Sequence, residues 1–128
     1  MNDHFKRLKA KFAGELSFGD NSATSNNSDT LIFKYDDSIT ISHSLQALDP
    51  TNPHALKLAE RNIRFIETVA PDFKNVEEWI KKSCIEAANT PKDVVKIEEK
   101  INSNLRLVCR YDKNVSVLDF SIEKIGSR

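Results

Sequence analysis

Two stretches of the sequence decide the expected fold: residues 31–41 read LIFKYDDSITI, and residues 107–117 read LVCRYDKNVSV. In each stretch an alternating apolar run reaches a tyrosine and an aspartate, and a second alternating run follows, which is typical of a β-hairpin. A three-residue loop would pair Tyr35 with Ile39 and bring the apolar side chains of both strands to one face. A loop of the same length is expected after Tyr111. The sequence therefore predicts two antiparallel hairpins.

The residues after the second hairpin change their alternation. Leu118, Phe120 and Ile122 are one position out of step with Val117. Because a one-residue slip moves side chains to the opposite face of a strand, two explanations are expected. Either a bulge lies near Val117 and Leu118, or the sheet is covered on both faces there, with the N-terminal helix as the candidate for the second cover.

The stretch between the hairpins has the pattern of helices. Asn52 is expected to cap a helix that begins with Pro53, and its wide apolar face predicts the central helix of the fold. Asn75 and Glu78 resemble a capping box, which predicts a second helix. Residues 91–101 fit either a third helix or a strand that would extend the second hairpin.

The ends of the chain complete the expected order of elements. Residues 1–16 carry apolar side chains at helical spacing, residues 17–29 are small and polar like a flexible link, and residues 30–125 form the main body. We therefore predict a single α+β domain over residues 1–128. Its antiparallel sheet of four or five strands is built from the two hairpins, with two or three central helices on one face and an N-terminal helix.

Composition limits the classes of function. The 128 residues include 19 Lys and Arg against 19 Asp and Glu, so the formal charge is zero and general attraction to nucleic acid or anionic membranes is not expected. No apolar run is long enough for a membrane span or resembles a secretory signal. The expected location is therefore the cytoplasm.

Residues with metal or redox chemistry are few and scattered. His4, His43 and His54 have no metal-binding spacing, and Cys84 and Cys109 form no CxxC motif. The cysteines are interpreted as small buried hydrophobic residues. The three glycines form no phosphate-binding loop, and no metal or cofactor is predicted.

One acidic set supports an alternative function. Asp36 and Asp37 lie in the first hairpin loop, and Glu98 with Lys100 has the Glu-x-Lys spacing of some metal-dependent nucleases. These four residues would form the metal site of a phosphodiesterase. Aspartate is also common in turns, and Glu and Lys are common on solvated surfaces, so a structural role is the favoured interpretation.

A nucleic-acid-binding alternative uses basic side chains. Lys57, Arg61 and Arg64 share one face of the central helix, although Glu60 and Glu67 interrupt this basic strip. The N-terminal segment would add Lys6, Arg7, Lys9 and Lys11. Because no aromatic stacking platform accompanies the strip, a solvated helix face is favoured over nucleic-acid binding.

Aromatic residues near charged loops offer contacts for a protein partner, although burial tendency favours a place at the edge of the core for each of them. The leading hypothesis is a small, non-catalytic protein-binding module of the inhibitor or immunity type, which docks on one protein partner and neutralises or protects it. Aromatic side chains beside charged loops are typical interface anchors, and an unpaired strand edge is a second docking feature. The candidate partner-binding residues are Tyr35, Asp36, Asp37, Trp79, Tyr111 and Asp112.

Overall fold

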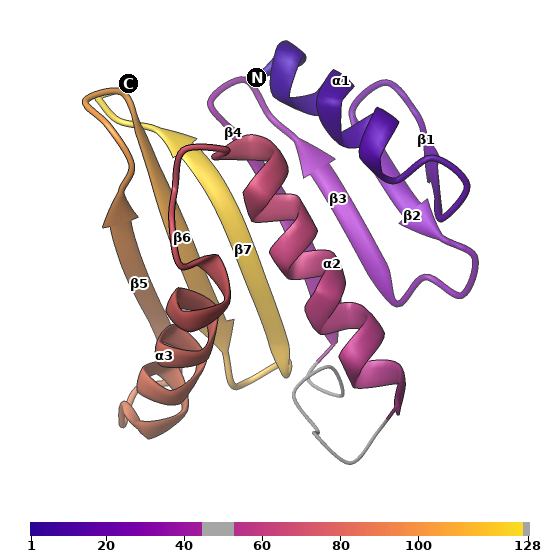
Figure 1. Ribbon diagram of the computed structural model, residues 1–128. Helices are drawn as coiled ribbons and strands as arrows, with labels where there is room; N and C mark the ends of the chain where they lie inside the picture. Colours follow the sequence, from indigo (N-terminus) through magenta and orange to yellow (C-terminus); the bar gives the residue numbers. More distant parts are fainter. Residues whose placement is uncertain (45–52, 127–128) are drawn as a thin grey trace.

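The computed structural model describes residues 1–44 and 53–126, and Figure 1 shows their arrangement. Within these residues the protein is α+β, with one seven-stranded antiparallel sheet and three helices. The order of the strands in the sheet is β1-β2-β3-β4-β7-β6-β5. The elements in chain order are α1 (Asn2–Lys11), β1 (Leu16–Phe18), β2 (Ser22–Ser25), β3 (Thr30–Lys34), β4 (Ser38–Ser44), α2 (Pro53–Val69), α3 (Val76–Asn89), β5 (Val94–Lys100), β6 (Leu105–Asp112) and β7 (Val117–Lys124). The predicted class and the N-terminal helix are confirmed, but the sheet is larger than four or five strands.

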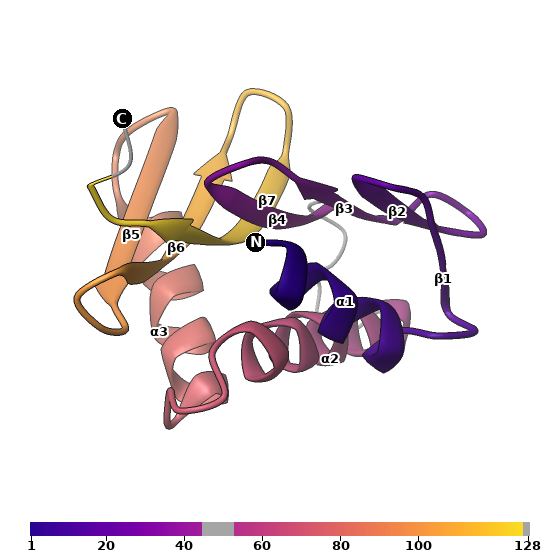
Figure 2. The same cartoon turned by 90° about the horizontal axis from the view of Figure 1, so that it is seen from above.

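The three helices lie on the same side of the sheet, as Figure 2 shows. Helix α2 packs on β4 and β7 at the centre, α3 packs on β5 and β6, and α1 packs on α2. The N-terminal helix is therefore not a second cover. Among the described residues, no helix lies on the opposite face, which we call the outer face.

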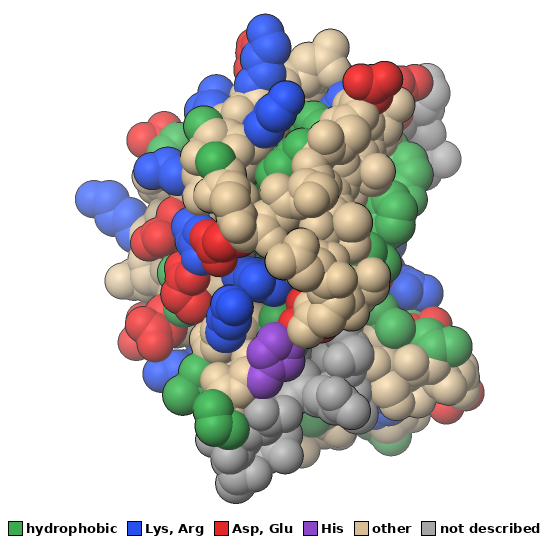
Figure 3. Space-filling model, turned by 90° about the vertical axis from the view of Figure 1, so that its right-hand side faces the viewer, with side chains coloured by type: hydrophobic (Ala, Val, Ile, Leu, Met, Phe, Trp, Pro, Cys, Tyr) green, Lys and Arg blue, Asp and Glu red, His purple; other side chains and the backbone are tan. Residues whose placement is uncertain are grey.

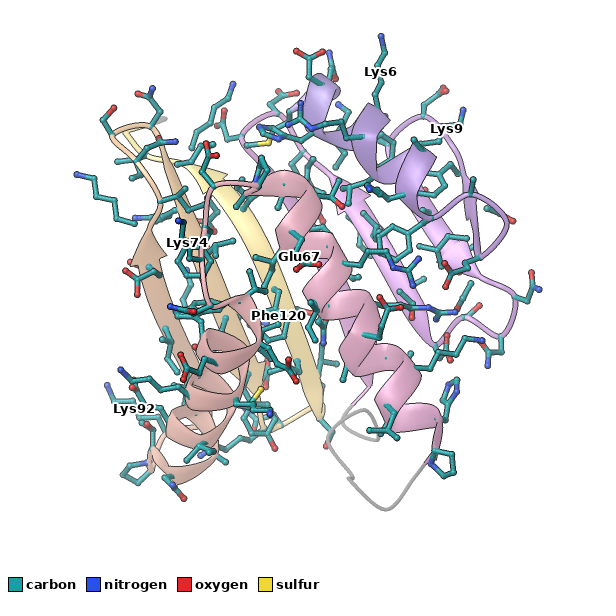
Figure 4. The ribbon with its side chains drawn as sticks, in the orientation of Figure 1. Lys6, Lys9, Glu67, Lys74, Lys92 and Phe120 are labelled. Atoms are coloured by element: carbon teal, nitrogen blue, oxygen red, sulfur yellow. The ribbon has the colours of Figure 1, made fainter. Side chains whose placement is uncertain are left out.

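The core fills the space between the sheet and the helices. One row of directly opposed residues crosses the sheet and points toward the helices: Ala23, Ile32, Ile41, Phe120, Cys109 and Ile97. Phe120 is fully buried, and its ring lies edge-on to Trp79 of α3, with the centroids 6.1 Å apart (Figure 4). Burial of an aromatic ring of this size contributes about 2–3 kcal/mol, so the row holds both halves of the sheet to the helices.

The first hairpin has a shorter loop than predicted. The N–H of Tyr35 donates to the carbonyl of Ser38 at 2.8 Å, so the loop contains only residues 36–37. The predicted three-residue loop is wrong because Ile32 is the inward-facing residue. It lies directly opposite Ile41, and both side chains are fully buried. The neighbours of Ile32 in β3 consequently point to the outer face.

The second hairpin has a longer loop than predicted. Asp112 pairs with Val117, which leaves a four-residue loop at 113–116. This loop length accounts for the change in alternation, because it sets Leu118 opposite Tyr111 on the helix side. Neither the predicted bulge nor a second covering layer is needed.

Pairing partners that are distant in the sequence determine the structure of two segments, and the first differs from the prediction. Residues 17–29 contain most of β1 and all of β2 and are not a link without structure. Ala23 is 2% exposed, and the hydroxyl of Ser25 contacts the carboxylate of Asp29 at 2.5 Å. The segment 91–101, for which the sequence leaves both a helix and a strand open, contains strand β5, paired along its length with β6. The strand that extends the second hairpin is therefore confirmed.

The helix starts are partly as expected. Pro53 is the first residue of α2, and Asn52 lies outside the described residues. Asn75 is the N-cap of α3, but its φ of 61° is left-handed and its side chain makes no capping hydrogen bond. The predicted capping box is therefore not formed.

Candidate functional site

A buried polar cluster joins α2 to strands β3 and β4. Arg61 donates from Nη1 to the carboxylate of Asp29 at 3.2 Å and to the hydroxyl of Thr30 at 2.7 Å. The ring of His43 lies between Thr30, with Nδ1 3.1 Å from its Oγ1, and Asn62, with Nε2 2.8 Å from its Oδ1. Arg61, His43 and Asn62 are each less than 5% exposed. We call these five residues the α2 polar cluster.

Burial and hydrogen bonding set the charges in the α2 polar cluster. Burial alone would raise the pKa of Asp29, but hydrogen bonds from Ser25 and His54 and the charge of Arg61 lower the pKa to about 2. Burial lowers the pKa of His43 to about 4. At neutral pH an ionised Asp29 therefore faces Arg61, and His43 is uncharged. Most polar atoms of the cluster are paired within it. Nε of Arg61 is buried without a hydrogen-bond partner among the described residues and lies 3.7 Å from the carboxylate of Glu15. Pairing of this kind is typical of a cluster that holds elements together.

Arg61 is the clearest difference from the sequence interpretation. The helical spacing predicts a place on a solvated basic strip, but Arg61 is 4% exposed and points into the α2 polar cluster. Arg64 pairs with Glu15 and Glu60, and its guanidinium lies 4.6 Å from the centre of the Phe12 ring. Two of the three cations of the strip are thus neutralised by carboxylates of the same chain.

The turn between β3 and β4 presents an aromatic side chain beside two carboxylates. Tyr35 is 57% exposed, and Asp36 and Asp37 are exposed. Within the described chain, neither aspartate forms an ion pair. The carbonyl of Asp37 accepts a hydrogen bond from the N–H of Lys124 at 2.9 Å, which ties the turn to the end of β7. We call residues 35–37 the acidic turn.

A shallow hollow of about 510 Å³ lies at the acidic turn. Asn21, Lys34, Tyr35, Asp36 and Asp37 line it. Phe33, on the outer face just before the turn, is 39% exposed. The hollow is mostly polar, and Tyr35 supplies its aromatic side chain.

The structure separates the other predicted partner-binding residues from the acidic turn. Trp79 is half-buried between the rings of Phe73 and Phe120. Tyr111 is half-buried against the core, and the carboxylate of Asp112 accepts the N–H of Asn114 at 3.0 Å. The register places Asp112 at the far end of β7 from the acidic turn, about 20 Å away at the rise of a β-strand. The six residues therefore lie in three separate places.

The predicted phosphodiesterase residues do not converge. Lys100 is opposite Arg106, and two further strands separate it from the acidic turn, which corresponds to about 14 Å across the sheet. Glu98 instead pairs with Arg106, with 3.7 Å between the charged atoms. Over residues 1–44 and 53–126, no three His, Cys, Asp or Glu side chains are grouped as metal ligands.

The two cysteines lie together although they are far apart in the sequence. A side-chain hydrogen bond joins Cys84 of α3 and Cys109 of β6; it raises the pKa of Cys109, which is also buried, and lowers that of Cys84. Cys109 is fully buried, as expected, and Cys84 is half-buried.

None of the described helices combines the length and the apolar character required to cross a bilayer. No protein-family model matches the chain, and no match is found among curated proteins or solved structures. Sequence reasoning selects Tyr35, Asp36 and Asp37 from their turn chemistry. It misses the α2 polar cluster, for which the only signal is the pair Arg61–Asn62 inside an otherwise apolar helix face.

Proposed function

We propose that the protein is a small, non-catalytic protein-binding module of the cytoplasm, which docks on one protein partner and neutralises or protects it as an inhibitor or immunity protein does. The observation that carries the proposal is the acidic turn. It combines the exposed ring of Tyr35 with two carboxylates that form no ion pair within the described chain. Elsewhere on the sheet, the carboxylates of Asp112, Asp119 and Glu123 pair with arginines of the same chain.

The chemistry of the acidic turn indicates the kind of partner. An exposed tyrosine supplies a large contact area with few rotatable bonds, and aromatic anchors of this kind carry much of the binding energy of interfaces. Unpaired carboxylates steer a basic partner toward the turn and increase the association rate. We therefore expect a partner whose binding surface has an apolar recess surrounded by Lys or Arg.

The local structure suits docking without reorganisation. The turn has only two loop residues, and backbone hydrogen bonds hold it to Ser38 and to Lys124 at 2.8 and 2.9 Å. A preformed turn loses little conformational entropy on binding, so more of the contact energy appears as affinity.

Co-purification from the source cell, followed by mass spectrometry, tests this proposal. The tagged wild type should retain one stoichiometric protein, and the triple variant Tyr35→Ala/Asp36→Asn/Asp37→Asn should lose it. A matched control, Leu56→Ala/Asp72→Asn/Asp93→Asn, changes exposed residues elsewhere and should retain it.

A second measurement uses the purified partner. Calorimetry should give a Kd at least about tenfold weaker for the triple variant, which corresponds to the loss of one aromatic anchor and two steering charges. The proposal fails if the wild type retains no stoichiometric protein, or if the triple variant binds with an unchanged Kd.

We do not propose the two alternative functions. For a phosphodiesterase, Asp36 and Glu98 belong to separate parts of the surface. For a nucleic-acid binder, Arg61 is buried and Arg64 is paired with two carboxylates of the same chain.

A further inference from the structure

The outer edge of β5 is long and unpaired. Strand β5 is the last strand of the sheet, and within the described residues its only strand neighbour is β6. It spans seven residues, whereas β1 at the opposite edge spans three. On the side of the molecule that carries β1 and β2, the charged side chains gather toward the helices (Figure 3). An edge as long as β5 exposes a row of N–H and C=O groups that can pair with another strand.

The hydrogen bonds at the two ends of β5 show which backbone groups point outward. The N–H of Ile101 donates to Leu105 at 2.9 Å, and the N–H of Lys113 donates to Asp93 at 2.8 Å. In an antiparallel pair such bonds recur at every second residue, so the odd-numbered residues of β5 bond to β6. The outward-pointing N–H and C=O groups therefore belong to Val94, Lys96, Glu98 and Lys100.

We propose that this edge pairs with the same edge of a second copy of the chain. The two β5 strands would be antiparallel about a two-fold axis at Ile97, so that the sheets of the two copies become continuous. In this register Lys96 lies opposite Glu98 of the second copy, and Val94 lies opposite Lys100 of the second copy. Each such pair exchanges two backbone hydrogen bonds, and all outward groups of β5 are satisfied.

Charge selects this register over its neighbours. Centred on Ile97, the pairing sets Lys96 and Glu98 directly opposite each other twice, once on each side of the axis. A pairing centred on residue 96 would oppose Lys96 to itself. A pairing centred on residue 98 would oppose Glu98 to itself and Lys96 to Lys100. Opposite charges at directly opposed positions stabilise a sheet and like charges destabilise it. A pairing centred on residue 99 also opposes Glu98 to Lys100, but it leaves Val94 and Lys96 opposite residues beyond the end of β5. Only the register centred on Ile97 pairs all four outward residues of β5 with one another and opposes no like charges.

An exposed isoleucine on α3, Ile85, also favours a second copy of the chain as the partner of the β5 edge. Glu78 and Lys82 of α3 line a hollow together with Glu99 of β5. Ile85 lies on the same helical stripe, three residues after Lys82, and is 63% exposed.

Helix α3 runs antiparallel to β5, as the positions of Lys74 and Lys92 at its two ends show (Figure 4). Ile85 therefore lies about 4.5 Å further along the helix from Lys82, toward the middle of β5, where Ile97 is found. Across the proposed axis the Ile85 side chains of the two copies would approach each other above the pair of Ile97 residues. The dimer would thus cover an apolar side chain that is exposed in the single chain.

Sedimentation equilibrium on the full chain tests the dimer. Between about 5 μM and about 500 μM the mass should rise from the 14.5 kDa of one chain toward twice that value. Lys96→Glu and Glu98→Lys should each weaken dimerisation by at least about tenfold, because each variant opposes like charges on both sides of the axis. An equimolar mixture of the two variants should recover the dimer, since the two carboxylates on the edge of one variant then face the two ammonium groups on the edge of the other.

Further variants separate this contact from general effects of charge or folding. Glu98→Pro removes an outward N–H and the carboxylate that faces Lys96 of the second copy, but no hydrogen bond to β6. It should give a folded monomer, checked by circular dichroism. Ile85→Ala should weaken the dimer less than either charge reversal. Lys9→Glu and Glu67→Lys lie on α1 and α2, away from β5 (Figure 4), and should dimerise like the wild type.

The proposal is overturned if the wild type remains monomeric at about 500 μM, or if Lys96→Glu and Glu98→Pro leave the dimer unchanged. Because the acidic turn is a separate surface, the triple variant used above should still dimerise. Loss of partner binding and loss of dimerisation can therefore be distinguished.

Discussion

The two faces of the sheet carry the same kinds of charged groups in different surroundings. On the helix side, Arg61 is 4% exposed and contacts Asp29 inside the α2 polar cluster. On the outer face, Arg106 pairs with Glu98 and Glu123, and its side chain is 36% exposed. Removing one partner of a buried pair leaves an uncompensated charge, whereas water and salt replace a lost partner at the surface. Burial, and not the number of ion pairs, therefore decides which charges stabilise this fold.

Two aspartates show how hydrogen bonding changes the effect of burial. Asp29 receives hydrogen bonds from Ser25 and His54 and faces Arg61, which together lower its pKa to about 2 despite burial. Burial raises the pKa of Asp119 on the outer face, and Ser42 and Arg110 offset this only in part. Its Oδ1 is buried without a hydrogen-bond partner among the described residues. The ionised form is favoured at Asp29 and disfavoured at Asp119.

The largest expected effect is that of Arg61→Met. This change keeps the length of the side chain but leaves the carboxylate of Asp29 buried without its cation, so we expect the free energy of unfolding to fall by about 3–5 kcal/mol. Urea denaturation followed by circular dichroism measures it. Arg106→Met on the outer face is the control and should cost less than about 1 kcal/mol, because its partners Glu98 and Glu123 are more exposed than Asp29. Equal losses for the two variants would contradict the comparison of the faces.

Lowering the pH should reduce the free energy of unfolding in two steps, which come from His43 and Asp29 of the α2 polar cluster. The pKa of His43 is about 4 in the folded protein against 6.5 when unfolded, so the unfolded chain binds the proton first and stability falls as the pH drops from 6.5 to 4. The shift corresponds to about 3 kcal/mol. Asp29 adds a second loss between pH 3.8 and about 2, because its folded pKa is the lower one. Urea denaturation at a series of pH values measures both steps.

His43→Gln is the control for the first step. Glutamine does not titrate, so the free energy of unfolding of this variant should be nearly independent of pH between 6.5 and 4, apart from the remaining groups. A variant that retains the full slope would show that another group produces it.

The two aspartates should respond in opposite ways to removal of their charge. Asp29→Asn should cost about 2 kcal/mol at pH 7, in line with the lowered pKa of Asp29. Asp119→Asn should leave stability unchanged or raise it by up to about 1 kcal/mol, because burial disfavours the carboxylate there. Thermal and urea unfolding of both variants give the sign of each change in the free energy of unfolding. If Asp119→Asn destabilised the protein as much as Asp29→Asn does, this explanation would be rejected.

The smallest effect is expected for Arg106→Ala. Its two ion pairs lie on the outer face, so the loss should be about 0.5 kcal/mol at low salt and should vanish in about 0.5 M NaCl. Urea denaturation at the two salt concentrations measures the difference. If the free energy of unfolding fell by more than about 2 kcal/mol at both salt concentrations, Arg106 would behave like a buried charge, and the comparison of the two faces would be wrong.

The candidate site could be predicted in part. Turn residues between two strands are usually exposed, which selects Tyr35, Asp36 and Asp37, and these three are exposed. The same reasoning selects Tyr111, and a position off the main apolar stripe of the predicted helix selects Trp79. Both side chains are half-buried, because they pack against the core. The charge of Arg61 fits a solvated face, but its partner Asp29 lies 32 positions earlier in the chain and draws it inward.

The sequence by itself determined the α+β class, the N-terminal helix, the two hairpins and the helices between them, because these depend on the spacing of apolar residues and on prolines and polar residues that separate the elements. Tertiary structure alone decided the loop lengths, the strands β1, β2 and β5, and the burial of Arg61. Strand register and strand formation in short polar segments depend on partners that are distant in the sequence. The free energy of a buried ion pair likewise depends on what surrounds it, which local periodicity does not specify.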